Sequence, residues 1–174
     1  MEYLKSIGDY KVYKPGKHDA LAAIKVSRWT KGAGTMLPKS PLEIMELFEK
    51  GDSVIVKNKL GVVLAHAAAT ATYSDGAVEI GSIYTDEKQR GKGLAKMATN
   101  AVLEDQHKKN PDSTLFALGN EMSSIMFKKM GATEMSTSEL SSEVWEFCST
   151  CPKRPKEVNM CCDTPYDLTK VTQR

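Results

Sequence analysis

The sequence predicts an α/β domain in which strands and helices alternate along most of its 174 residues. Two apolar runs, 53–57 and 60–73, flank a short turn and predict a β-hairpin. A strand-like run over 77–85 passes through a glycine-bearing turn into a helical pattern over 93–108. A further strand and a short helix, ended by a glycine, are predicted within 113–131. This order of elements is typical of one mixed sheet flanked by helices.

The composition fits a single globular domain, with 41% hydrophobic and 26% charged residues. The 24 basic and 22 acidic residues give a net charge of +2, too balanced to indicate binding to nucleic acid or a membrane. No apolar run approaches the ~20 residues of a membrane span. The N-terminal residues lack the basic start and apolar core of a signal peptide. We therefore expect a cytoplasmic protein.

The N-terminal third predicts one short strand and two helices. The strand covers Val12–Lys14, and Asp19 is a candidate cap for a helix from Ala20 to about Arg28. Residues 29–40 contain two glycines and a proline and are expected to form a loop. A second helix is predicted over 41–50, with a serine as its cap and a proline in its first turn.

The stretch Gln89-Arg90-Gly91-Lys92-Gly93-Leu94-Ala95 connects the central predicted strand to its helix. The first N–H groups of a helix have no intrahelical partner and lie at the positive end of its dipole. Gly91 and Gly93 lack a Cβ, so the backbone here can approach a bulky anion, and Arg90 and Lys92 add positive charge. The stretch therefore predicts a pyrophosphate site, and an ordinary turn with solvated cations is the alternative.

Two common nucleotide-binding patterns do not fit this stretch. A P-loop requires Ser or Thr after its lysine, and neither follows Lys92. The dinucleotide fingerprint requires a third glycine where Lys96 stands. The remaining pattern, Arg90-x-x-Gly93-x-Ala95, resembles the coenzyme A loop of the GNAT family of acetyltransferases.

A second stretch strengthens this resemblance. Asn120, Phe127, Lys129 and Gly131 stand at the spacing of the second GNAT signature, in which an asparagine ends a strand and a short helix follows. The two signatures occur in the family's order and separation. The resemblance covers roughly 54–147.

The resemblance implies a mixed, mostly antiparallel sheet with a splayed strand pair, in a GNAT acetyltransferase domain over 1–148 with a cysteine-containing tail over 149–174. It implies acetyl-coenzyme A (acetyl-CoA) as the donor of an acetyl group. The acceptor would be an amine, of unknown identity, on a small molecule or peptide, attacking directly in a ternary complex. A homodimer remains open. The alternative function is a non-catalytic, regulatory module that binds acyl-CoA.

The resemblance also implies which residues contact CoA. In the family, the pantetheine arm enters the gap beside the central strand, where the backbone of Ile83 and Thr85 would pair with its amides. The complete expected set comes from this strand, the loop and the second signature: Ile83, Tyr84, Thr85, Arg90, Gly91, Lys92, Gly93, Leu94, Ala95, Asn120 and Phe127.

Glu79 is the expected general base. Side chains alternate along a strand, so Glu79, Gly81 and Ile83 are predicted to share one face. A carboxylate in a central strand is costly unless it is paired or functional. A glutamate on this strand often serves as the base in the family. The alternatives are a strand-edge carboxylate facing water and a member of an ion pair.

The sequence departs from the family at Phe127, where many members carry a tyrosine that protonates the leaving thiolate. Tyr84 and Ser123 are the candidate substitutes. In the loop over 29–40, Trp29 and Met36 are candidates to line the acceptor pocket, with a core position as the alternative for Trp29. The three histidines show no triad or metal spacing and are expected to be structural or on the surface: His18, His66 and His107.

Beyond the second signature, extended segments are expected over 132–135 and 144–148. All four cysteines follow, as Cys148-x-x-Cys151 and then Cys161-Cys162. Clustered thiols in a cytoplasmic protein favour a metal over a disulfide, but adjacent cysteines are awkward ligands for one zinc ion. Metal binding, redox or disulfide chemistry, and a packed tail all remain open. A tail residue, Tyr166, is a candidate cover for the acceptor site.

Overall fold

The computed structural model describes residues 1–34, 36–149, 151 and 164–171. Single turns of 3₁₀ helix precede the loop before α3 and the start of α5. The strands and helices of the described residues are β1 (Glu2–Ile7), β2 (Tyr10–Lys14), α1 (Ala20–Gly32), α2 (Pro41–Glu49), β3 (Ser53–Asn58), β4 (Val63–Thr72), β5 (Val78–Thr85), α3 (Leu94–Lys109), β6 (Leu115–Gly119), α4 (Glu121–Met130), β7 (Thr133–Glu134), α5 (Ser142–Ser149) and β8 (Thr164–Asp167).

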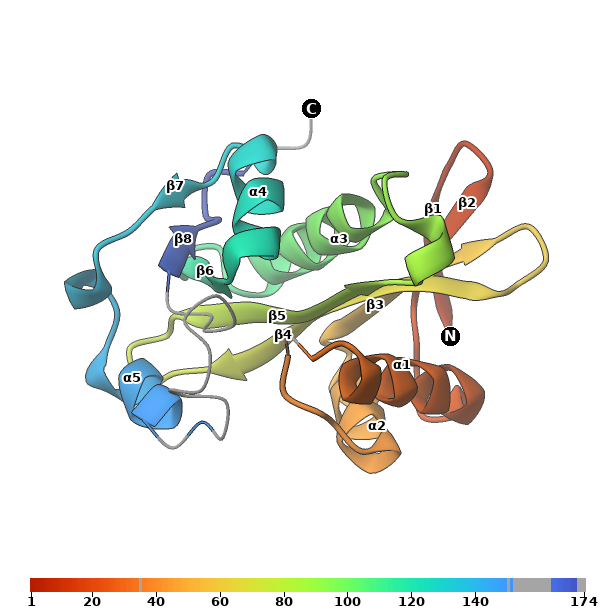
Figure 1. The fold of residues 1–174 in the computed structure, drawn as a ribbon, viewed down its shortest axis with the longest axis horizontal. Coiled ribbons are helices and arrows are strands. Elements are labelled where there is room, and N and C mark those ends of the chain that lie inside the picture. The colour runs from red at the N-terminus through yellow and green to blue at the C-terminus, as the bar shows by residue number, and fades with distance from the viewer. Residues whose placement is uncertain (35, 150, 152–163, 172–174) are drawn as a thin grey trace.

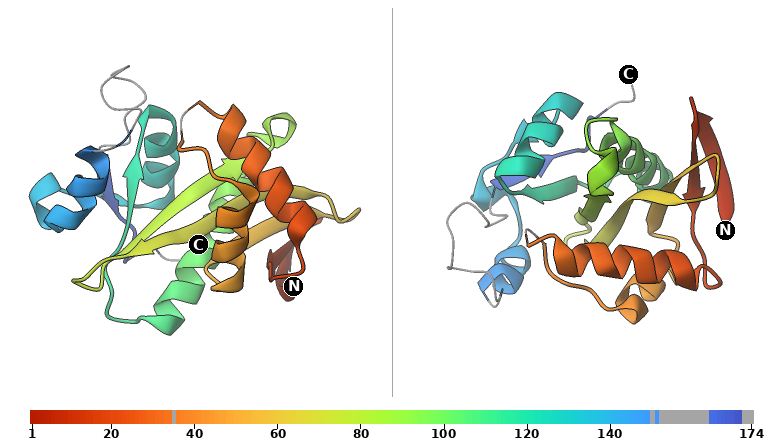
Figure 2. Two further views of the ribbon diagram at one scale, coloured as in Figure 1. Left: turned by 90° about the horizontal axis from the view of Figure 1, so that it is seen from below. Right: turned by 45° about the vertical axis from the view of Figure 1, so that its right-hand side comes forward.

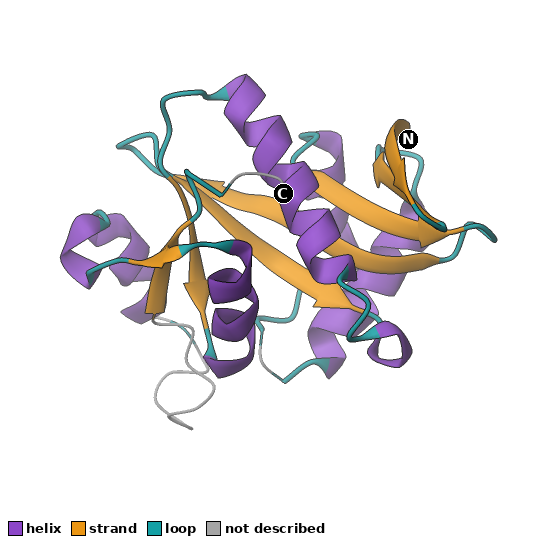
Figure 3. Cartoon of the chain, turned by 90° about the horizontal axis from the view of Figure 1, so that it is seen from above, coloured by secondary structure: helices purple, strands orange, loops and turns teal. Residues whose placement is uncertain are grey.

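The described strands form one eight-stranded sheet in the order β1-β2-β3-β4-β5-β6-β8-β7 (Figures 1 and 3). Every neighbouring pair is antiparallel except β5 and β6. These two strands pair only at their starts, where Val78 lies opposite Leu115 and Glu79 opposite Phe116. Beyond that point they separate, which confirms the predicted mixed sheet with a splayed pair.

Helices cover both faces of the sheet, α3 and α4 on one side and α1 and α2 on the other (Figures 1 and 2). Leu94, Val102 and Phe127 bring α3 and α4 into a core with the sheet. Val26 and Phe48 bring α1 and α2 into a second core on the opposite face. Among the described helices, none is long and apolar enough to cross a membrane.

Local signals explain the helices that were predicted well. Ser40 Oγ accepts a hydrogen bond from Glu43 N at 3.2 Å, and the Glu43 carboxylate accepts one from Ser40 N at 2.7 Å. This reciprocal cap begins α2 at Pro41, as expected. Gly131 ends α4 with φ of +89°, a left-handed conformation that glycine adopts without strain.

Two predicted elements are wrong and one strand was missed. The helix expected to end near Arg28 continues to Gly32, because Thr30 is buried and Trp29 packs against the second core. The strand β1 was missed because it lies at an edge and shows no alternating apolar pattern. Residues 144–148 belong to helix α5 rather than to a strand, since a short apolar run does not distinguish the two.

The C-terminal residues 164–167 belong to the sheet, although the sequence placed them beyond the core. Strand β8 inserts between β6 and β7, and Tyr166 and Leu168 are fully buried. Tyr166 packs against Phe127 and does not line the cavity described below, so its expected role as a cover is wrong. The β6–β8 pairing is a long-range contact with no local signal in the sequence.

Only part of the cysteine cluster can be placed. Cys151 is a free thiol. Cys161, Cys162 and the side chain of Cys148 lie outside the described residues, and the metal and disulfide alternatives lie there with them. Within the described residues, no three metal-ligating side chains form a group that could hold an ion.

Candidate active site

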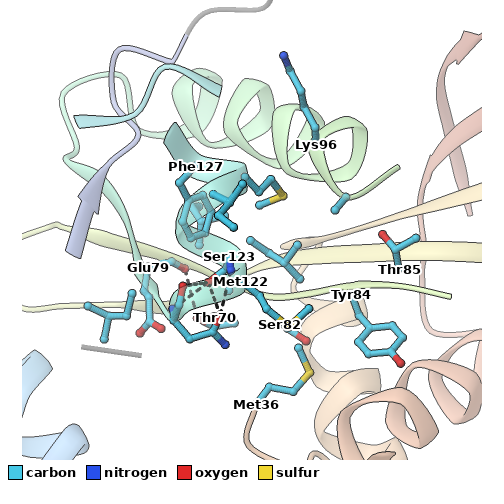
Figure 4. A pocket seen from close by; sticks show the side chains of 18 of the residues that line it. Met36, Thr70, Glu79, Ser82, Tyr84, Thr85, Lys96, Met122, Ser123 and Phe127 are labelled. Atoms are coloured by element: carbon cyan, nitrogen blue, oxygen red, sulfur yellow. Dashed lines mark hydrogen bonds between the residues drawn. The ribbon is translucent and has the colours of Figure 1, made fainter. Parts of the chain in front are cut away.

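A cavity of about 850 Å³ opens where β5 and β6 separate. Most of its lining comes from the segment before α2, strand β5, the loop before α3 with the start of that helix, and α4, and individual residues in or near β4, β6 and α5 complete it. Figure 4 shows Glu79, Ser82 and Tyr84 on β5, with Ser123 and Phe127 on α4. Its volume lies within the range of roughly 300–1,000 Å³ typical of small-molecule sites.

A bulge at Ser82 shapes the wall formed by β5. Among the described residues, Ser82 is the one non-glycine residue with positive φ, at +50°. The register between β4 and β5 shifts on either side of Ala68, opposite this part of β5. Backbone strain of this kind is sustained only where the surrounding structure fixes it.

His66 fixes the bulge from the adjacent strand β4. Its Nδ1 lies 2.8 Å from the Ser82 carbonyl oxygen, so this nitrogen donates, and Nε2 lies 3.3 Å from Ser53 Oγ. The imidazole is fully buried, and burial lowers the pKa of His66 to about 4. His66 is therefore a neutral donor at physiological pH.

The bulge shifts the alternation of side chains along β5, so residues on either side of it that are three positions apart face the same way. Ile80 is buried in the core beneath α3, and Ile83, three residues later, packs against the same core. Tyr84 faces the other side and stacks on Trp29 with ring centroids 5.1 Å apart. The prediction that Ile83 shares a face with Glu79 is therefore wrong, because an irregular strand does not keep the period of two.

Glu79 lines the cavity from the start of the splayed region. Its Oε2 accepts a hydrogen bond from the Tyr73 hydroxyl at 2.8 Å. Desolvation raises the pKa of Glu79, and the bond from Tyr73 and the positive charge of Lys39 oppose this shift. No ion pair among the described residues includes Glu79. A partly desolvated carboxylate facing a cavity has the properties of a general base.

The glycine loop leaves open space above the N-terminus of α3. Gly91 and Gly93 have φ of +79° and +74°, and a Cβ added at either position would meet nothing within 4 Å. The first helical hydrogen bond runs from Met97 N to Gly93 O at 3.0 Å. The N–H groups of Leu94 and Ala95 precede it and point out of the helix end. The loop therefore fits an anion held by backbone amides.

Cationic side chains surround this end of the cavity. Arg90, Lys96 and Lys129 line it. The Arg90 guanidinium also lies 5.9 Å from the centre of the Tyr84 ring. Lys92 does not line the cavity, and its Nζ donates to Gln89 Oε1 at 2.7 Å. Every other residue expected to contact CoA lines this one cavity.

The start of α4 forms the opposite wall. Asn120 Oδ1 accepts a hydrogen bond from Ser123 N at 2.9 Å and so caps the helix. Phe127 is buried against Tyr166, with ring centroids 5.5 Å apart. Phenylalanine has no proton to give, whereas the candidate substitutes Tyr84 and Ser123 both line the cavity.

Comparisons with known proteins agree with this geometry. The family model described as FR47-like protein matches residues 59–141. An uncharacterized N-acetyltransferase of Chlorobaculum tepidum, CT2212, is 29% identical over 148 residues, covering 83% of this chain and 86% of that protein. In both comparisons the chain is similar to N-acetyltransferases, in agreement with the GNAT resemblance of its two signatures.

Solved structures show that the chain shares the fold of proteins crystallised with coenzyme A. Rv2747 from Mycobacterium tuberculosis, solved in complex with CoA, has a TM-score of 0.66 and 17% identity, covering 93% of this chain and 99% of that one. N-acetylglutamate synthase from Neisseria gonorrhoeae, complexed with coenzyme A and N-acetyl-glutamate, has a TM-score of 0.70 and 13% identity. The match covers 94% of this chain and 35% of the gonococcal one.

The lining of the cavity away from the glycine loop was only partly predicted. Met36 lines the cavity as expected, and Trp29 takes the core position that was its alternative. Lys39 and Tyr73 were missed. The register of the β4–β5 hairpin could have placed Tyr73 near Glu79, because Tyr73 N donates to Ala77 O across the turn. Lys39 lies in a connecting segment with no pattern.

Proposed function

We propose that acetyl-CoA binds in this cavity, with its pyrophosphate at the N-terminus of α3 and its pantetheine arm between β5 and β6. The diverging strands support this proposal, because on the β6 side no strand of the described residues pairs with the backbone of Ile83 and Thr85. The open space above Gly91 and Gly93 supports the pyrophosphate position. Acetyl-CoA supplies the reactive thioester when it is bound.

The proposed acceptor is an amine on a small molecule, and Glu79 is the proposed base. The amine loses a proton to the Glu79 carboxylate, directly or through water, and its nitrogen forms the new bond to the acetyl carbon. The carbon–sulfur bond breaks in the same complex, so no covalent acyl-enzyme is required. Backbone N–H groups near the Ser82 bulge are the candidates to polarise the thioester carbonyl. The N-acetyl-glutamate bound to the gonococcal relative supports a small acceptor.

The leaving thiolate takes a proton from a group other than Phe127. The hydroxyls of Tyr84 and Ser123 are the two proposed sources within the cavity lining, and solvent is a third. A CoA thiol is a fair leaving group, so this step does not demand a strong acid.

The observation that carries the proposal is one cavity that holds both Glu79 and the glycine loop. Calorimetric titration with acetyl-CoA, followed by thiol release with a pool of amines, tests it. Binding with amine-dependent thiol release supports the proposal. Binding without release would favour a regulatory acyl-CoA module. Absence of binding would overturn the assignment of the cavity.

A further inference from the structure

We propose that the acceptor is a primary amine that also carries a carboxylate, and that Lys39 binds this carboxylate. The inference rests on the proposed function, because it places the acceptor amine beside Glu79. It depends on four residues that line the cavity, Met36, Lys39, Tyr73 and Glu79, which we name the acceptor end.

The backbone of Lys39 is held in place by two hydroxyl groups of α1. Ser27 Oγ donates to the Lys39 carbonyl oxygen at 2.7 Å, and Lys39 N donates to Thr30 Oγ1 at 2.9 Å. Both hydroxyl-bearing residues are only 2% exposed. The next residue, Ser40, caps α2. The chain therefore fixes the position from which the lysine side chain enters the cavity, and this preorganisation lowers the entropy cost of binding a ligand.

Lys39 lines the same cavity as Glu79. Its charge lowers the pKa of both Glu79 and His66, so it acts on the β4–β5 region of the cavity. None of the ion pairs formed by the described residues includes Lys39. The charge of Lys39 also lowers the pKa of Glu43 in the first turn of α2, but a half-buried cation with no direct ion pair can still bind an anionic group of a ligand.

The charges at the two ends of the cavity differ in origin. Arg90 precedes the glycine loop, Lys96 lies in the first turn of α3, where the proposed CoA phosphates bind, and Lys129 comes from α4. Lys39 comes from the connection between α1 and α2, on the opposite face of the sheet. The acceptor end therefore offers a carboxylate for an amine and, separately, an ammonium for a carboxylate. A polyamine would place a second positive charge against Lys39, which disfavours that class of acceptor.

Matched acceptors test the inference directly. L-amino acids are assayed against their own α-carboxamides, and β-alanine against its carboxamide, in wild type, Lys39→Met and Lys31→Met. Lys31 is an exposed lysine of the last turn of α1 and does not line the cavity, so it is the matched control. A charge-assisted hydrogen bond is worth about 1.5–3 kcal/mol, so the preferred acid should exceed its amide by about ten- to a hundredfold in kcat/KM.

In Lys39→Met the preference for the acid over its amide should disappear, because the KM for the acid rises. Lys31→Met should keep the preference. The amide lowers the basicity of the neighbouring amine, so that bias works against the expected result. Equal rates with acids and amides in wild type, or an unchanged ratio in Lys39→Met, would overturn the inference. Binding is measured separately, by NMR titration of the CoA-loaded proteins with each acid and its amide. The acid should bind more tightly than the amide to wild type and Lys31→Met, but not to Lys39→Met. If no amine is acetylated, the proposed function fails, and the binding titration still decides the role of Lys39.

Discussion

Replacing Glu79 with Gln separates the chemistry of this site from its architecture. The amide has nearly the shape of the carboxylate, and its oxygen still accepts the hydrogen bond that the Tyr73 hydroxyl donates at 2.8 Å. It cannot take a proton from the acceptor amine. General-base catalysis contributes about 10²–10⁴-fold, so kcat should fall by that factor, equivalent to about 3–5 kcal/mol of transition-state stabilisation.

The stability of Glu79→Gln should move in the opposite direction from its activity. Burial raises the pKa of Glu79, so the folded state favours the protonated form more than the unfolded state does. This contribution to stability is complete below the unfolded pKa and is lost as pH rises through the folded pKa. At neutral pH the substitution removes a desolvated charge, and its melting temperature should equal or exceed that of wild type.

The assay compares wild type, Glu79→Gln and Glu49→Gln, an exposed glutamate of α2, by thiol release and by calorimetric titration with acetyl-CoA. Wild-type kcat/KM should fall as pH drops through the raised pKa of Glu79, and this acidic limb should be absent in Glu79→Gln. Acetyl-CoA affinity should not change. If Glu79→Gln turned over at the wild-type rate, the carboxylate would not be the general base. Loss of acetyl-CoA affinity would show that Glu79 supports the donor site instead.

Three other substitutions probe separate parts of the site. Gly93→Val forces a β-branched residue to φ of +74° and fills the space above the loop, so acetyl-CoA affinity should be lost while the circular dichroism spectrum stays native; unchanged affinity would remove the loop assignment. Tyr73→Phe deletes a hydrogen bond that lowers the pKa of Glu79, so the acidic limb of kcat/KM should move to higher pH, and an unmoved limb would contradict the contact. Because burial lowers the pKa of His66 to about 4, wild-type unfolding free energy should decrease as pH falls from 6.5 towards 4. His66→Gln should lose that part of the pH dependence and, by releasing Ser82, reduce kcat more than acetyl-CoA affinity; identical pH curves for the two proteins would argue against this account.

The parts of the fold that the sequence predicted depend on local signals. Gly91 and Gly93 adopt positive φ, and Gly131 ends its helix in the same way, so each glycine marks a backbone conformation that other residues avoid. The cap formed by Ser40 likewise depends on neighbours three residues apart. Signals of this range are visible in a sequence without any knowledge of tertiary structure.

The features that were missed depend on contacts between distant residues. The bulge at Ser82 depends on a hydrogen bond from His66, sixteen positions earlier in the sequence. Strand β8 depends on pairing with β6, far from it in the chain, and Lys39 is held by hydroxyls of a different helix. The sequence therefore indicated the glycine loop and a candidate base, whereas the shape of the acceptor end could be seen only in the folded structure.

A crystal structure of the protein with bound acetyl-CoA tests the central claim most directly. We expect pyrophosphate oxygens within hydrogen-bonding distance of backbone N–H groups in the stretch 91–96. The acetyl group should lie between β5 and β6, in the same cavity as the Glu79 carboxylate. Acetyl-CoA bound elsewhere on the protein, or an acetyl group separated from Glu79 by the sheet, would contradict the account.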